Sequence, residues 1–192
     1  MTTNQNTAPA AQSVEDLING YAINTIEATN LMLSNHLYGQ LMIIIYSTID
    51  ALGLLDAPPT KVEADNVTFK SWVKKYLLPQ DPSLTFSETD MWGARCGVLH
   101  TFTAQSRLSG QGNAKQIVYY SGDKSGPGAQ QLLAFVQAQS ATHVAAHIED
   151  TLMAFLNGIK AFAPDLTAKC KADPKVEARL RNVLQQYFVP DA

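Results

Sequence analysis

Apolar residues recur at helical spacing in two stretches of the N-terminal third of the chain, separated by a short polar segment. The first stretch covers residues 14–31 and the second covers residues 37–55, before Pro58 and Pro59. Because side chains three and four positions apart share one face of a helix, and proline ends helices, the pattern predicts two long helices or one bent helix. Residues 1–13 contain neither a basic residue nor an apolar run, which predicts a disordered tail.

Two shorter helical patterns follow in the middle of the chain. Residues 68–77 have an amphipathic pattern that Pro79 ends, and its apolar face comprises Phe69, Trp72, Val73, Tyr76 and Leu77. We interpret Lys70, Lys74 and Lys75 as a solvated face, with steering of phosphate groups as the alternative. Ser87 and Asp90 resemble a capping box, which predicts a helix over residues 88–108. Trp72 and Trp92 are predicted to anchor the core.

The C-terminal half combines turn residues, a β-prone segment and two further helical patterns. The turn sequence SGQGN precedes AKQIVYYSG and the loop DKSGPG, which predicts a small β-hairpin within residues 107–127, with residues 107–111 as its first limb. Residues 130–162 read as one long helix that Pro164 ends, and residues 174–188 read as a final helix. The predicted fold is therefore mainly α: a single helical-bundle domain over residues 14–188 with a small β-hairpin insertion.

Composition and charge narrow the class of protein. The chain has 192 residues, of which 46% are hydrophobic and 16% charged, so one domain with a sizeable core is expected. The formal net charge of -3 excludes a wholly basic nucleic-acid-binding surface. Residues 1–60 contain no Lys or Arg, whereas residues 61–124 hold eight of the 14. A local anion-binding site is therefore expected in the middle of the chain.

The same features indicate a cytoplasmic protein without a membrane span. The two cysteines cannot form a disulfide framework, which favours a reducing compartment. The most apolar segment, residues 41–55, carries Asp50 and is shorter than the roughly 20 apolar residues that a bilayer requires. We therefore interpret it as a buried helix.

The segment MWGARCGVLHTFTAQSRL, residues 91–108, contains Arg95 and His100 with four residues between them. This spacing resembles the R-x4-6-H motif of the HEPN superfamily, helical-bundle proteins that often cleave RNA and often form dimers. The order of predicted elements is similar too: an apolar helix that ends near Asp50, then the motif helix, then a further long helix. The resemblance spans residues 14–162. Cys96 stands where the family commonly has Asn, Asp or His, and Phe102 stands where some HEPN toxins have Tyr.

The resemblance implies an endoribonuclease that uses no metal or other cofactor, acts on single-stranded RNA rather than DNA, and works as a homodimer with its site at the dimer interface. An RNA-binding relative that lacks the activity is the alternative within the family. The residue types fit that chemistry, because histidine can take the proton of a ribose 2′-hydroxyl and arginine can stabilise charge that develops on the phosphate. Five positions at about 100° each place His100 roughly 140° around an ideal helix from Arg95. Loosening of the helix near Gly97, a long reach by Arg95, or a two-fold partner would bring the two groups together.

Three further residues are candidates to support this pair. Asp50 lies in an apolar helix where an unpaired carboxylate is costly, so Arg95 is its expected partner; a solvated position at the helix end is the alternative. Cys96 is either a thiol activated by Arg95 or a buried packing residue. Thr101 follows His100 and completes the supporting set.

Candidate RNA contacts are Arg107, Lys115, Tyr119 and Tyr120, which can bind phosphate or stack on bases; ordinary surface and strand positions are the alternative. Two other interpretations stay open. Arg95 and His100 can form a non-catalytic pair in a module that binds a protein or a small ligand. His143, His147 and Asp150, at helical spacing, can hold a zinc ion if residues 130–162 are one helix.

Overall fold

The structure is a computed structural model that describes residues 12–103 and 105–184. Residues 1–11 of the predicted tail and residues 185–188 of the predicted final helix lie outside the described residues. The secondary structure is mainly helical, as the sequence predicts, with a small two-stranded sheet. The elements are α1 (Val14–Ser34), α2 (Tyr38–Asp56), α3 (Asn66–Trp72), a π-helical turn (Val73–Leu77), a 3-10 turn (Leu78–Gln80), α4 (Glu88–Thr101), α5 (Arg107–Gly110), β1 (Gln116–Tyr120), α6 (Pro127–Ala138), β2 (His143–His147), α7 (Ile148–Ala172) and α8 (Pro174–Leu184).

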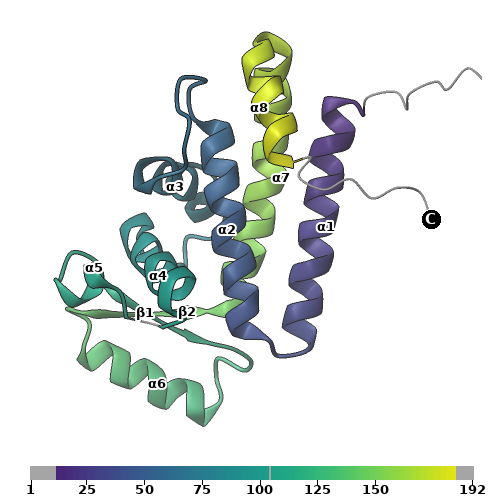
Figure 1. Ribbon diagram of the computed structural model, residues 1–192. Coiled ribbons are helices and arrows are strands. Elements are labelled where there is room, and N and C mark those ends of the chain that lie inside the picture. The colour runs from purple at the N-terminus through teal and green to yellow at the C-terminus, as the bar shows by residue number, and fades with distance from the viewer. Residues whose placement is uncertain (1–11, 104, 185–192) are drawn as a thin grey trace, which may run out of the picture.

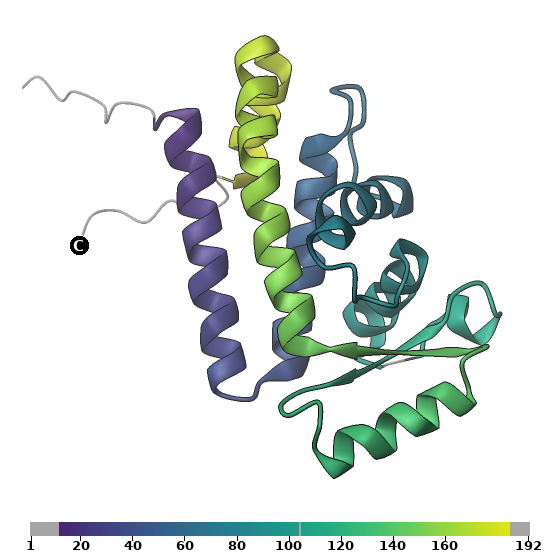
Figure 2. The same ribbon diagram turned by 180° about the vertical axis from the view of Figure 1, so that it is seen from behind.

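The long helices α1, α2 and α7 lie side by side (Figures 1 and 2). Helix α8 folds back against them at the end opposite the β-sheet. Of the two sequence interpretations, two separate helices is the correct one. Ser13 caps the start of α1 by accepting a hydrogen bond from the Asp16 amide at 3.0 Å. The turn that follows Ser34 includes His36 at a φ of 56°, a left-handed conformation that a continuous helix cannot contain.

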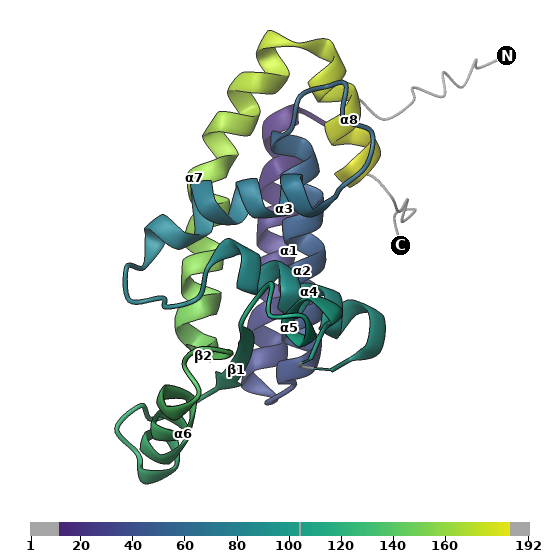
Figure 3. The ribbon, with the colours of Figure 1, turned by 90° about the vertical axis from the view of Figure 1, so that its left-hand side faces the viewer.

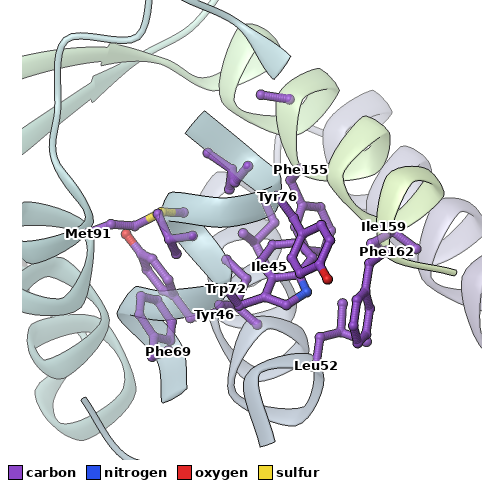
Figure 4. Packing of buried hydrophobic residues seen from close by; sticks show 14 of the residues in the cluster. Ile45, Tyr46, Leu52, Phe69, Trp72, Tyr76, Met91, Phe155, Ile159 and Phe162 are labelled. Carbon is purple, nitrogen blue, oxygen red and sulfur yellow. The ribbon is translucent and has the colours of Figure 1, made fainter. Parts of the chain in front are cut away.

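Aromatic side chains from α3, the π-helical turn and α7 form the centre of the core (Figure 4). The ring of Trp72 lies 6.3 Å from the rings of both Phe155 and Phe162, centroid to centroid. Gly158 allows this approach, because a Cβ there would lie 3.2 Å from the Trp72 ring. All five residues of the apolar face predicted within residues 68–77 are buried, which confirms that pattern.

The predicted β-hairpin is wrong. Residues 107–110 form the short helix α5, capped by Ser106, and β1 pairs in parallel with β2 through the crossover helix α6. In the pairing register Gln116 faces His143 and Tyr120 faces His147. Residues 116–120 do form a strand, as the sequence predicts. Its partner, β2, follows α6 because two parallel strands need a crossover connection between them.

The single long helix predicted over residues 130–162 is also wrong at its start. The chain forms α6, β2 and only then α7, and Val144 and Ala146 are buried in the alternation of a strand. Val144 and Ile148, four positions apart, also suit helical spacing, so periodicity alone favoured the helix. Pro164 does not end α7, which continues to Ala172. Proline has no N–H, so the backbone carbonyl of Lys160, four residues earlier, lacks its helical donor. Pro164 and Lys160 are both exposed, so water can solvate that carbonyl.

One helix, α2, is long and apolar enough to cross a membrane by length and composition, with a mean hydropathy of 1.4. Half of that window is buried inside the protein. The helix therefore serves as a core element, and the structure is compatible with a soluble protein.

Helix α2 packs closely against the backbone of α3 at Gly53. A Cβ at Gly53 would lie 2.6 Å from the carbonyl oxygen of Thr68, so backbone must move to admit it. We expect Gly53→Ala to lower the free energy of unfolding by about 1 to 3 kcal/mol, measured by urea denaturation. Gly20→Ala in α1 is the matched control: nothing lies within 4 Å of its Cβ, and we expect a gain of up to about 1 kcal/mol. Equal stability of the two variants would contradict this packing.

Candidate active-site cleft

Helix α4 carries the motif residues and has well-defined ends. Ser87 and Asp90 form both hydrogen bonds of the predicted capping box, and Asp90 also accepts a hydrogen bond from the amide of Lys115 at 2.5 Å. The helix ends at Thr101 rather than at the predicted residue 108, because Phe102 adopts a left-handed conformation with a φ of 53°. The chain then turns back along α4 into α5, and α3, α4 and α5 lie together on one side of the long helices (Figure 3).

Asp50, Arg95 and His100 form one contiguous group. Nε and one terminal nitrogen of Arg95 donate to Oδ2 of Asp50, at 3.0 and 2.6 Å. The other terminal nitrogen lies 3.3 Å from Nε2 of His100. Because an arginine nitrogen can only donate, Nε2 presents its lone pair to Arg95. The predicted partnership of Asp50 with Arg95 is confirmed, and a solvated Asp50 is wrong.

The contact between Arg95 and His100 forms within one chain. Helix α4 is regular from Glu88 to Thr101, so the long arginine side chain spans the angular offset and the helix does not loosen at Gly97. A partner subunit is not needed to bring these two residues together. The offset therefore gives no argument for a dimer, contrary to the expectation from helix geometry.

Arg95 is held on three sides, which fixes its guanidinium. Its side chain is 18% exposed and that of Asp50 is 16% exposed. The guanidinium carbon also lies 4.9 Å from the ring centroid of Trp92. Trp92 packs against Phe69 at 5.3 Å and is only partly buried, so it is less enclosed than the core anchor that the sequence predicts. Oδ1 of Asp50 is buried and has no hydrogen-bond partner among the described residues.

A cleft of about 750 Å³ opens beside His100, between α4, α5 and the start of α3. Trp92, Cys96, Thr101 and Arg107 are among the residues that line it. Burial raises the pKa of the Cys96 thiol, and the charges of Arg95 and Arg107 oppose that rise. A raised pKa disfavours the reactive thiolate, which argues against an activated thiol. Cys96 is only partly buried and lines the cleft, so it is not the buried packing residue of the other interpretation either.

Only one of the four candidate RNA contacts, Arg107, lines this cleft, where its side chain is exposed. Lys115 is exposed but lines a separate hollow beside α6. The hydroxyl of Tyr119 lies 2.5 Å from that of Tyr46, and burial raises the pKa of both groups. Tyr120 lies beside a third hollow. Lys115, Tyr119 and Tyr120 are therefore not brought to His100.

The proposed zinc ligands are separated by the strand that replaces the predicted helix. His143 and His147 stand at opposite ends of β2, and Nδ1 of His143 contacts the hydroxyl of Thr142 at 2.8 Å. Nδ1 of His147 lies 3.3 Å from Asp150, while its Nε2 faces the carbonyl of Gly122. Within residues 12–103 and 105–184, no three His, Cys, Asp or Glu side chains gather in a way that could hold a metal ion.

Sequence reasoning missed two amide residues that line the cleft. Asn66 from α3 and Gln105 from the connection between α4 and α5 both line it. Gly97 allows that connection to lie close, because a Cβ there would be 2.6 Å from the carbonyl oxygen of Thr103. The glycine two positions after Arg95 was the available signal for a close backbone approach.

No protein-family model, curated protein or solved structure gives a significant match to this chain. Geometry and side-chain chemistry therefore carry the functional proposal.

Proposed function

We propose that the protein is a HEPN-like, metal-independent endoribonuclease that acts on single-stranded RNA through Arg95 and His100. The contact between these two side chains at the mouth of a cleft, with Asp50 fixing the arginine, is the observation that carries the proposal. The test is cleavage of single-stranded RNA by the purified protein in the presence of EDTA, compared with its His100→Ala variant.

The geometry suits an attack by the ribose 2′-hydroxyl on the adjacent phosphorus. A phosphate that enters beside His100 can take over the arginine nitrogen that now lies 3.3 Å from Nε2. The lone pair of Nε2 is then free to accept the 2′-hydroxyl proton. The 2′-oxygen bonds to phosphorus, the bond from phosphorus to the 5′-oxygen breaks, and that oxygen takes a proton from water. The product ends are a 2′,3′-cyclic phosphate and a 5′-hydroxyl.

Arg95 is suited to stabilising the charge that develops on the phosphate. Two of its nitrogens are fixed by Asp50, which leaves the third directed at the position next to His100. A guanidinium that is already oriented loses little freedom when the reaction proceeds, and this preorganisation makes such donors effective. Asp50 is thus a positioning residue and not a catalytic one.

A homodimer is part of the proposal, and its support comes from α2. Ile43, Ser47, Asp50 and Leu54 lie along one stripe of this helix, and none of them is fully buried. A largely apolar helix whose stripe is only partly covered is suited to packing against a second copy. Because Asp50 belongs to the stripe, a two-fold partner there would place two Asp50–Arg95–His100 groups near one another.

Light scattering tests the dimer. We expect a mass of about twice that of the 20.9 kDa chain at tens of micromolar. Ser47→Arg introduces a charge in the middle of the stripe and should yield monomers. Ser34→Arg is the matched control, because Ser34 is also an exposed helical serine bonded to its own backbone but lies at the end of α1. A monomeric wild-type protein at this concentration contradicts the dimer.

A non-catalytic module for protein or small-ligand binding is the second candidate. The observation that favours it is the ion pair itself, since Asp50 already satisfies two nitrogens of Arg95. A folded protein that does not cleave RNA, but in which His100→Ala weakens binding of a ligand, would support this candidate. For either function we propose a cytoplasmic location, in keeping with Cys96 and Cys170, which are both free thiols.

A further inference from the structure

Besides His100, two amide side chains line the cleft. Asn66 stands at the first position of α3, and Gln105 lies in the connection between α4 and α5. Both are exposed, and neither side chain makes a hydrogen bond to another described residue. Each amide therefore offers a donor and an acceptor to a molecule in the cleft.

Both amides stand beside backbone contacts that the structure describes. Asp65 forms a capping box with Thr68 immediately before Asn66. The backbone carbonyl of Gln105 accepts a hydrogen bond from the hydroxyl of Thr103 at 2.8 Å, and Gly97 permits this connection to lie against α4. Both side-chain amides are therefore available to a molecule that enters the cleft.

The other lining residues match a flat, weakly polar group attached to an anion. Trp92 and Leu108 provide partly buried apolar surface in the cleft. Arg107 is exposed and forms no ion pair within residues 12–103 and 105–184. Asp65, the one carboxylate that lines the cleft, is paired with Lys61, and that contact together with the amides of α3 lowers its pKa. The cleft thus has a free cation but no free carboxylate.

We infer that this cleft is a nucleobase-binding subsite that takes one unpaired adenine, with Arg107 on the phosphate of that nucleotide. The inference rests on the proposed function and names the substrate feature that the same site selects. Unpaired bases in RNA are recognised by stacking on apolar or aromatic side chains and by hydrogen bonds to their edges. One amide can pair in bidentate fashion with the N6 and N7 positions of adenine, and the second with its N6 and N1 positions. Adenine alone offers a donor beside an acceptor on both of these edges, which favours this base over the other three.

Binding of nucleoside 3′-monophosphates, measured by calorimetry, tests the subsite without requiring catalysis. We expect the adenine nucleotide to bind at least about 10-fold more tightly than the uracil nucleotide. Asn66→Ala and Gln105→Ala should each reduce that ratio by about 5-fold or more, because each removes one edge contact. Gln111→Ala is the matched control, since Gln111 is exposed outside the cleft, and it should leave the ratio unchanged.

Arg107→Gln separates the phosphate contact from base recognition. We expect this variant to bind each of the four nucleotides about 3-fold to 10-fold more weakly, and to keep the preference for the adenine nucleotide. Equal affinities for the four nucleotides, no binding, or a preference that survives both Asn66→Ala and Gln105→Ala would overturn the subsite. A nucleoside 3′-monophosphate contains no phosphodiester bond for the proposed reaction, so its binding is measured independently of cleavage. Adenine-selective binding without RNA cleavage would therefore reject the proposed nuclease instead.

Discussion

His100→Ala should abolish most RNA cleavage while leaving the fold intact. A side chain that moves a proton in the rate-limiting step typically contributes 10² to 10⁴ in rate, and we expect a loss of about that size. His100 is exposed at the last turn of α4, and its side chain makes one hydrogen bond within residues 12–103 and 105–184, with Arg95. Its removal should therefore change the free energy of unfolding by less than about 0.5 kcal/mol. Initial rates on single-stranded RNA, together with urea denaturation, measure the two effects.

His143→Ala is the control for this result. His143 is a partly buried histidine at the start of β2, outside the cleft, and its loss should leave the cleavage rate within about 2-fold of wild type. Equal rates for wild type and His100→Ala would remove His100 from the mechanism. A similar loss in His143→Ala would point to a general structural effect rather than to chemistry at the cleft.

Arg95→Ala should affect both activity and stability. Loss of a fixed donor to the developing charge should lower the rate by about 10² to 10³. The same change leaves the carboxylate of Asp50, 16% exposed and already with one oxygen unpartnered, without its counter-ion. Removing one partner of a largely buried ion pair is costly, so we expect a loss of on the order of 3 kcal/mol in the free energy of unfolding. Thermal and urea denaturation measure the second effect.

A double variant separates these two roles of Arg95. Adding Asp50→Asn to Arg95→Ala removes the uncompensated charge, so stability should rise relative to Arg95→Ala alone. Activity should stay low, because the cation is still missing. If the double variant is no more stable than Arg95→Ala, the ion pair does not account for the stability loss. If activity returns, Arg95 has no chemical role.

Sequence periodicity predicted most of the helices. Each of them buries one face, so its apolar residues recur every three or four positions. Val14–Ser34 and Tyr38–Asp56 match the predicted stretches closely. The failures occurred where two structures share one pattern. Val144 and Ile148, four positions apart, fit a helical stripe, yet Val144 is buried together with Ala146 as alternate residues of β2. The parallel partner of β1 was not predictable from local signals, because α6 separates the two strands in sequence.

The candidate site was predictable in part for a similar reason. An arginine that needs a counter-ion and a carboxylate in an apolar helix each require a partner, which is why Asp50 and Arg95 could be paired from sequence. Asn66 and Gln105 have no such requirement, because exposed amides are satisfied by water. Their place in the cleft depends on where α3 and the connection after Phe102 pack, and Phe102 ends α4 through a left-handed conformation that its residue type does not favour.

The chemical nature of the product ends tests the central claim most directly. The measurement is phosphorus NMR or mass spectrometry of single-stranded RNA incubated with wild-type protein in EDTA, beside the His100→Ala variant and a DNA strand of the same sequence. We expect 2′,3′-cyclic phosphate ends from RNA with the wild-type protein alone, and intact DNA, because the 2′-hydroxyl is the nucleophile. Cleavage that requires a metal ion, that occurs equally in DNA, or that persists unchanged in His100→Ala would contradict a metal-independent ribonuclease acting through Arg95 and His100.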